Sequence, residues 1–179
     1  WLRPLTADPA AAAAVLGDGV DGRAFVVRSA VGEHARGWFA WGEAGGLRPP
    51  GPAPAAGDAG VERCGAEAIY AFLGAAGLSY GPLYRTLDEA VLGPAAASAT
   101  LTAPAGAPGI WPAAAADGVL QLAALLRLRR GDERGVPFAA DRLVWHAPWP
   151  DRLRVHVWRN AEGAVDGVAT DTAGRPVLT

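Results

Sequence analysis

Residues 111–130 read WPAAAADGVLQLAALLRLRR, and this stretch decides the fold of the chain. Its large aliphatic residues leave no continuous polar face before the closing arginines, so the pattern predicts a helix that is apolar nearly all round. Such a helix has to be enclosed by other elements, and we expect a sheet curled around it. The residues that predict this burial are Val119, Leu120, Leu122, Leu125, Leu126 and Leu128.

Two polar residues of this stretch lie four positions apart. Asp117 is predicted near the start of the helix, where an aspartate can cap free backbone amides and is favoured by the helix dipole. Gln121 follows one turn later and therefore lies on the same face. The spacing leaves two interpretations open, a cap beside a polar filler or a functional pair, and by itself it favours the first.

The composition argues against several classes of protein. With 179 residues, one real hydrophobic core is expected. A formal net charge of −2 is not that of a nucleic-acid binder. No apolar run approaches the roughly 20 residues that cross a bilayer, and no secretion signal is found at the start, so we expect a cytoplasmic protein without a membrane segment. Cys64, the one cysteine, can form neither an internal disulfide nor a metal site alone, and we expect no metal centre.

Short strands and a second helix are predicted on either side of the long helix. A glycine- and proline-rich break over residues 42–58 separates an upstream hairpin from the rest. Beyond the break, helical spacing predicts a helix over residues 61–76, stopped by Gly77. The order predicts an α+β fold, an antiparallel sheet wrapped around one long buried helix. The predicted strands are residues 24–29, 35–41, 85–92, 95–101, 142–145, 153–158, 165–170 and 175–178.

Several motifs resemble those of dehydratase domains in modular type I polyketide synthases, and along the chain they occur in the family's order. Residues 77–84, GLSYGPLY, resemble the family's GxxYGPxF motif. Asp117 and Gln121 match its D-x-x-x-Q motif, and residues 136–138, VPF, are similar to its LPF segment. Residues 153–155 and 171–177 are similar to its closing strands, and residues 25–42 look like the end of its first half. Together these matches cover most of the chain.

The resemblance implies a double hotdog, in which two units, each a sheet around a long helix, are joined by a linker. On this interpretation residues 1–42 are remnant strands of a first hotdog, lacking most of that unit. Residues 43–60 are the Pro/Gly-rich linker, and residues 61–179 are the C-terminal hotdog. Neighbouring synthase domains are the implied partners, and a homodimer is a further expectation from the resemblance.

The resemblance also implies a reaction. Family members remove water from a β-hydroxyacyl chain carried on the phosphopantetheine of acyl carrier protein, so that protein is an implied partner and no other cofactor is expected. A first-half histidine takes the α-proton, and the second-half aspartate helps the hydroxyl leave. Carried over by motif, Asp117 is the acid, Gln121 orients it, and an apolar pocket would raise the pKa of the aspartate. The implied substrate-binding residues are Tyr80, Gly81, Pro82, Trp111, Pro137 and Phe138.

The chain also departs from the family pattern. Trp111 replaces the usual histidine, and one extra alanine precedes Asp117. The catalytic motif H-x-x-x-G-x-x-x-x-P is not matched around His34, His146 or His156. We therefore expect a dehydratase-like domain that is inactive in this form. Two alternatives stay open: the C-terminal part of an active dehydratase whose catalytic histidine lies outside this chain, and a related hotdog isomerase or cyclase.

Overall fold

The chain forms two compact units, Trp1–Gly45 and Gly46–Thr179. The computed structural model describes residues 13–19, 22–29, 32–39, 60–106, 108–129 and 140–179. Each unit contains a sheet of its own, with three strands described in the first and six in the second. The strands and helices that position the candidate site belong to the second unit.

The first unit contains β1 (Ala13–Gly19), β2 (Gly22–Ser29) and β3 (Gly32–Phe39), paired antiparallel in that order. A bulge between Val27 and Arg28 shifts the register of β2 against β3. The hairpin predicted over residues 24–41 is confirmed for the part that is described. Its assignment to a first hotdog stays a prediction.

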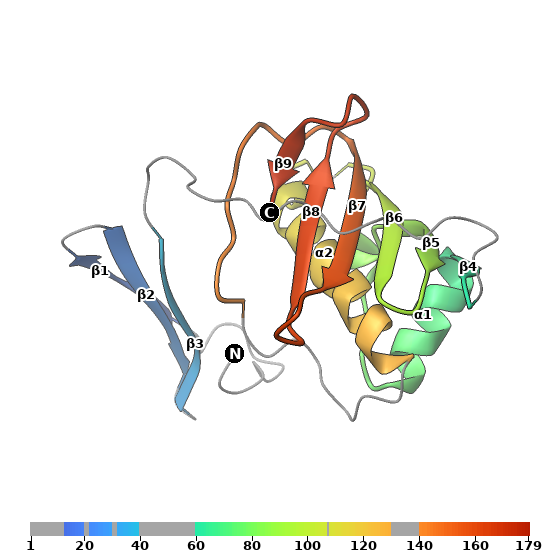
Figure 1. The fold of residues 1–179 in the computed structure, drawn as a ribbon. Coiled ribbons are helices and arrows are strands. Elements are labelled where there is room, and N and C mark those ends of the chain that lie inside the picture. The colour runs from blue at the N-terminus through green and yellow to red at the C-terminus, as the bar shows by residue number, and fades with distance from the viewer. Residues whose placement is uncertain (1–12, 20–21, 30–31, 40–59, 107, 130–139) are drawn as a thin grey trace. The chain divides into compact units, whose positions relative to one another are not determined.

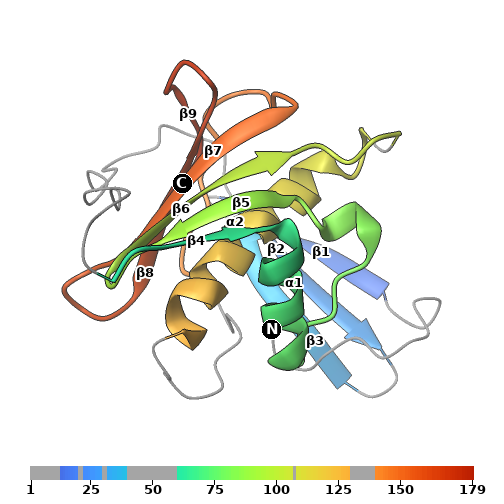
Figure 2. The same ribbon diagram turned by 90° about the vertical axis from the view of Figure 1, so that its right-hand side faces the viewer.

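The second unit is a six-stranded antiparallel sheet, in the order β4-β5-β6-β7-β8-β9, that packs on a long helix. Figures 1 and 2 show that helix, α2, lying along one face of the strands, while α1 lies beside β4 and β5. The predicted α+β class is therefore confirmed. The elements are β4 (Glu62–Gly65), α1 (Ala66–Ala75), the 3-10 turn η2 (Pro82–Tyr84), β5 (Leu87–Leu92), β6 (Ala96–Thr102), α2 (Trp111–Leu128), β7 (Arg152–Arg159), β8 (Val165–Thr170) and β9 (Pro176–Leu178).

The core lies between α2 and the inner face of the sheet. Leu153, Val155 and Val157 of β7 are buried because alternate residues of a strand point to the same side. They meet Leu122 and Leu125 of α2 in one apolar cluster. Burying a side chain of this size contributes about 1.5–3 kcal/mol, so this interface is the main source of stability for the second unit.

The predicted start of the first helix was wrong. β4 takes up the beginning of that segment and pairs with β5, and α1 begins only at Ala66. The sheet edge provides hydrogen bonds that helical spacing alone does not reveal. The predicted end is confirmed. Gly77 has a φ of +88°, and the Leu78 and Gly77 amides donate to the Leu73 and Gly74 carbonyls, both at 2.9 Å, which is a Schellman motif.

A strand predicted over residues 142–145 was also wrong. Trp145 forms a single bridge with Leu178, and Val144 exchanges two hydrogen bonds with Thr179, of 2.7 and 3.0 Å. Pro148 and Pro150 follow closely, and a proline has no N–H to continue a ladder. The segment is therefore a loop with a short paired stretch.

The capping position predicted for Asp117 was wrong as well. α2 begins at Trp111 with Ile110 as its N-cap, so Asp117 lies nearly two turns inside the helix. Pro112 is tolerated in the first turn of a helix. Residues 113–116 are all alanine, the residue type with the highest helix propensity. Both extend the helix ahead of the aspartate. Helix capping therefore does not explain the position of the Asp117 carboxylate.

Candidate active site

Asp117 and Gln121 form a hydrogen-bonded pair on one face of α2. Gln121 Nε2 donates to Asp117 Oδ2 at 2.6 Å, which confirms the expected proximity of residues four apart on a helix. Gln121 is fully buried, with 0 % of its surface exposed, whereas Asp117 is partly buried. A fully buried amide thus binds one carboxyl oxygen of an aspartate that is itself only partly buried.

Further hydrogen bonds satisfy the rest of the Gln121 amide. Its Nε2 also donates to the Tyr84 backbone carbonyl at 2.8 Å, and its Oε1 accepts from the Tyr70 hydroxyl at 3.0 Å. The Tyr70 hydroxyl in turn accepts from the Leu87 backbone N–H at 2.9 Å. Buried polar groups are costly unless they are paired, so this network is consistent with a site held in one geometry.

No motif or spacing in the sequence singles out Tyr70. It lies on α1 between the buried residues Ile69 and Leu73, at 8 % exposure. A tyrosine on the buried face of a helix has to find a hydrogen-bond partner for its hydroxyl, and that is the signal that could have identified it. Its partners are distant in sequence, so the sequence alone could not have named Gln121.

Tyr80 is a second tyrosine of the site, close enough to Asp117 to be affected by its charge. Its ring packs edge-on against Tyr70 with centroids 6.1 Å apart. The Arg85 guanidinium lies 5.3 Å from the centre of the Tyr70 ring, and its Nε donates to the Tyr80 carbonyl at 3.0 Å. Burial, together with the charges of Asp117 and Tyr70, raises the pKa of Tyr80 to about 12, so this hydroxyl stays neutral at physiological pH.

The environment raises the pKa of the Asp117 carboxyl. Burial is the main cause, because a charge is disfavoured where it is removed from water, and the hydrogen bond from Gln121 acts in the opposite direction. The aspartate is therefore easier to protonate than an exposed one. A carboxyl of this kind can donate a proton to a leaving group.

Trp111 is held by the fold itself. It is 3 % exposed, its Nε1 donates to the Pro150 carbonyl at 2.8 Å, and its ring packs edge-on against Trp149 at 6.5 Å. Gly81 precedes η2 and Pro82 begins it, and both are exposed. Pro137 and Phe138 lie outside the described residues. Substrate binding by these residues stays a prediction.

In the second unit, the side chains of two histidines are described, and neither is hydrogen-bonded to Asp117. His146 Nε2 lies 2.9 Å from Thr179 Oγ1, and His156 Nδ1 lies 3.0 Å from Ser98 Oγ. His34 is on β3 of the first unit, and its side chain is outside the description. Among the described residues, no group of three His, Cys, Asp or Glu side chains could hold a metal ion. Within the described part of the second unit, Asp117 thus has no histidine base bonded to it.

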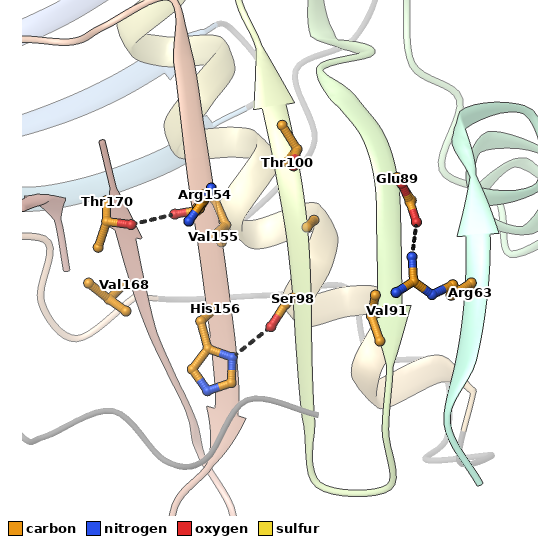
Figure 3. A pocket seen from close by; sticks show the side chains of 11 residues that line it. Arg63, Glu89, Val91, Ser98, Thr100, Arg154, Val155, His156, Val168 and Thr170 are labelled. Atoms are coloured by element: carbon orange, nitrogen blue, oxygen red, sulfur yellow. Dashed lines mark hydrogen bonds and ion pairs between the residues drawn. The ribbon is translucent and has the colours of Figure 1, made fainter. Parts of the chain in front are cut away.

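A shallow pocket of about 350 Å³ lies elsewhere, on the outer face of the sheet (Figure 3). Arg154 and His156 line it, and they alternate with residues that point inward to α2. Two of its ionic groups pair with each other, since Arg63 binds Glu89 at 2.8 Å across β4 and β5. The pocket is open to solvent, and neither Asp117 nor Gln121 lines it.

None of the described helices has the length and apolar character needed to cross a membrane.

Comparison with known proteins gives a consistent result. Residues 48–179 match the sequence model of the polyketide synthase dehydratase N-terminal domain. A curated relative is the spectinabilin polyketide synthase system protein NorB of Streptomyces orinoci, 34% identical over 156 residues. That match covers 82% of this chain and 7% of the relative, so the chain spans a small part of the relative's length.

Solved structures with the same fold are dehydratase domains. A fusion DH domain is 28% identical with a TM-score of 0.62, and the match covers 91% of this chain and 59% of that one. The dehydratase domain of RzxB from Pseudomonas fluorescens is 22% identical with a TM-score of 0.72, covering 99% and 70%. The predicted hotdog fold is thereby confirmed. The matching sequence model is described as N-terminal, whereas residues 77–84 and 117–121 resemble second-half motifs, so the division into halves stays a prediction.

Proposed function

The chain belongs to the polyketide synthase dehydratase family, and on this premise we propose that Asp117 is the acid of a site that dehydrates β-hydroxyacyl thioesters on acyl carrier protein. The observation that carries the proposal is the bond from Gln121 to Asp117, 2.6 Å long and made by a fully buried amide. Burial raises the pKa of the same carboxyl, as an acid catalyst requires.

In the proposed step, a base removes the α-proton, and the electron pair of that C–H bond becomes the new carbon–carbon double bond. The bond between the β-carbon and its hydroxyl oxygen breaks, and Asp117 donates its proton to the departing oxygen, which leaves as water. The aspartate is left as a carboxylate and regains a proton before the next cycle. An acid is needed because hydroxide is a poor leaving group.

None of the described histidine side chains is placed to act as the base. The 179 residues contain no H-x-x-x-G-x-x-x-x-P segment, and neither His146 nor His156 bonds to Asp117. We therefore propose that this chain alone binds the thioester without dehydrating it, and that a larger polypeptide supplies the histidine. Tyr80, Gly81 and Pro82 are the proposed contacts near the thioester.

The proposed partners are acyl carrier protein, which delivers the substrate on its phosphopantetheine, and the neighbouring domains of a polyketide synthase. Family membership makes such domains the natural context of this chain. Assembly as a homodimer and a cytoplasmic location remain predictions. The carrier-protein interaction can be measured directly, by titrating the chain with a β-hydroxyacyl carrier protein.

Mass spectrometry of a β-hydroxyacyl carrier-protein thioester tests the proposed reaction. The thioester is incubated with the 179-residue chain and, separately, with a longer polypeptide that contains both this chain and the family's histidine motif. We expect loss of one water only with the longer polypeptide. Asp117→Asn in that polypeptide should reduce the rate by at least about 100-fold, the contribution typical of a general acid.

The controls separate chemistry from folding. Asp171→Asn changes a partly buried aspartate that binds Arg175 in a turn, outside the Asp117 pair, and it should leave the rate unchanged. Turnover that survives Asp117→Asn would contradict the role of Asp117. Water loss catalysed by the 179-residue chain alone would contradict the proposed need for an external base.

A further inference from the structure

We infer that Tyr70 is a positioning residue of this site: its hydroxyl group fixes the orientation of the Gln121 amide, and Asp117 in consequence holds its acidic proton on Oδ1. The inference rests on the proposed role of Asp117 as the acid. It concerns a residue on α1, a different element from the one that carries the catalytic pair.

Backbone groups at both ends set the direction of the hydrogen bonds. The Leu87 N–H can only donate, and it donates to the Tyr70 hydroxyl oxygen at 2.9 Å. The Tyr70 hydroxyl hydrogen is then directed to Gln121 Oε1, 3.0 Å away. At the other end the Tyr84 carbonyl can only accept, and it takes a hydrogen from Gln121 Nε2 at 2.8 Å. A reversed amide would place oxygen against carbonyl oxygen and would leave the Tyr70 hydroxyl without its acceptor.

The fixed amide decides which oxygen of Asp117 carries the proton. Gln121 Nε2 donates to Oδ2 at 2.6 Å, and an amide NH₂ group cannot accept a hydrogen bond. A proton on Oδ2 would therefore weaken this bond, because a hydroxyl oxygen is a poorer acceptor than a carbonyl or carboxylate oxygen. A proton on Oδ1 leaves the bond intact. The acidic hydrogen thus has a defined place before substrate binds, which is the condition for efficient transfer.

Tyr70→Phe tests the inference. It removes the hydroxyl but keeps the ring that packs on Tyr80 and lies under Arg85. In the 179-residue chain labelled with ¹³C at the aspartate carboxyl carbons, NMR follows the Asp117 signal with pH, and Asp117→Asn identifies that signal. We expect the pKa of Asp117 to shift upward in Tyr70→Phe, because the amide is no longer held as a donor to the carboxylate.

A double-mutant cycle separates positioning from general packing. Gln121→Ala alone should also shift the pKa of Asp117 upward, and adding Tyr70→Phe should then have no further effect, since the hydroxyl acts through the amide. Tyr84→Phe is the matched control: it removes a hydroxyl from the neighbouring tyrosine, keeps the backbone carbonyl, and should leave the pKa unchanged. An unchanged pKa in Tyr70→Phe, or an equal shift with and without Gln121, overturns the inference.

A measurement on the unaltered chain covers the case in which Tyr70→Phe does not fold. With ¹⁵N-labelled glutamine, both side-chain NH₂ protons of Gln121 should exchange slowly with water, because one is bonded to the Tyr84 carbonyl and the other to Asp117. A reversed amide would leave both protons without these acceptors, so fast exchange overturns the inference. Neither readout depends on turnover. If the shift is observed and no polypeptide containing the chain removes water, the proposed function fails while the role of Tyr70 stands.

Discussion

Asp117 occupies a position that its own residue type does not favour. Aspartate has low helix propensity in the middle of a helix, where its side chain competes for backbone hydrogen bonds. Burial also raises its pKa, which means that the charged form is destabilised. Gln121 offsets part of that cost with a 2.6 Å hydrogen bond. A titratable group held against both tendencies is typical of a functional site.

The raised pKa predicts how stability depends on pH. Because the folded pKa of Asp117 lies above its unfolded value, the native state binds more protons between the two values, and the stability contributed by this residue falls as pH rises through that window. Asp117→Asn removes the charge and can still accept from Gln121. We therefore expect the variant to be more stable than the parent at neutral pH and to lose this advantage below the unfolded pKa.

Urea denaturation of both proteins across a pH series checks this expectation. The lowered pKa of Asp171, caused mainly by the Arg175 backbone N–H, changes stability in the opposite sense but is common to both proteins. It cancels when the free energies of unfolding are subtracted. A stability difference that is independent of pH would show that Asp117 titrates as an ordinary exposed aspartate.

At the scale of elements, α2 can approach the sheet closely because residue 118 is a glycine. A Cβ at Gly118 would lie 2.7 Å from Thr86 Oγ1 and 2.9 Å from Leu101 Cδ2. Glycine inside a helix is unfavourable by about 1 kcal/mol relative to alanine, so close packing is the physical reason for its presence. α2 also contacts η2 and β5, the elements that contain the carbonyl of Tyr84 and the N–H of Leu87.

Gly118→Ala should therefore lower the free energy of unfolding by about 1–3 kcal/mol, as overpacking of a core does. Gly74→Ala is the matched control, because it lies in α1 with nothing within 4 Å of an added Cβ. That variant should be neutral or more stable by about 0.5–1 kcal/mol, from helix propensity. Urea denaturation measures both. Equal effects of the two substitutions would show that α2 does not pack on Thr86 and Leu101 as closely as described.

At the scale of the whole molecule, the second unit contains a complete core. Among the side chains that the structure describes, the buried cluster runs from Ile69 to Leu178, within this unit. The first unit, by contrast, is described as a three-stranded sheet alone. A sheet of this size needs an apolar face, or a helix packed on it, to be stable by itself.

We expect a fragment of residues 46–179 to fold without residues 1–45. Its thermal unfolding, followed by circular dichroism, should be a single cooperative transition. Leu122→Ala in the fragment should lower its stability by about 2–5 kcal/mol, as a cavity in a real core does. A fragment that melts without cooperativity, or that does not respond to the leucine substitution, would show that the second unit depends on the first for its core.

Several elements could be predicted from local patterns because the relevant physics is local. Strict alternation in β7, an apolar helix in α2 and a positive-φ glycine at Gly77 each leave a signal within a few residues. β4 could not be predicted, since its hydrogen bonds come from β5, more than twenty positions away. The family's motifs identified Asp117 and Gln121. Tyr70, which bonds to Gln121, comes close to them only when the chain folds.

The sequence by itself determined the α+β class, the long helix and the adjacency of Asp117 and Gln121. These follow from periodicity and from the fixed rise of a helix. Three helix residues that were also predicted to be buried are only partly buried, namely Val119, Leu120 and Leu128. Only the tertiary structure decided that Asp117 lies inside the helix, that Gln121 is fully buried, and that Tyr70 and the Tyr84 carbonyl hold its amide in one orientation. The physical reason is that burial and hydrogen-bond direction depend on groups distant in sequence, which come together only when the sheet closes over α2.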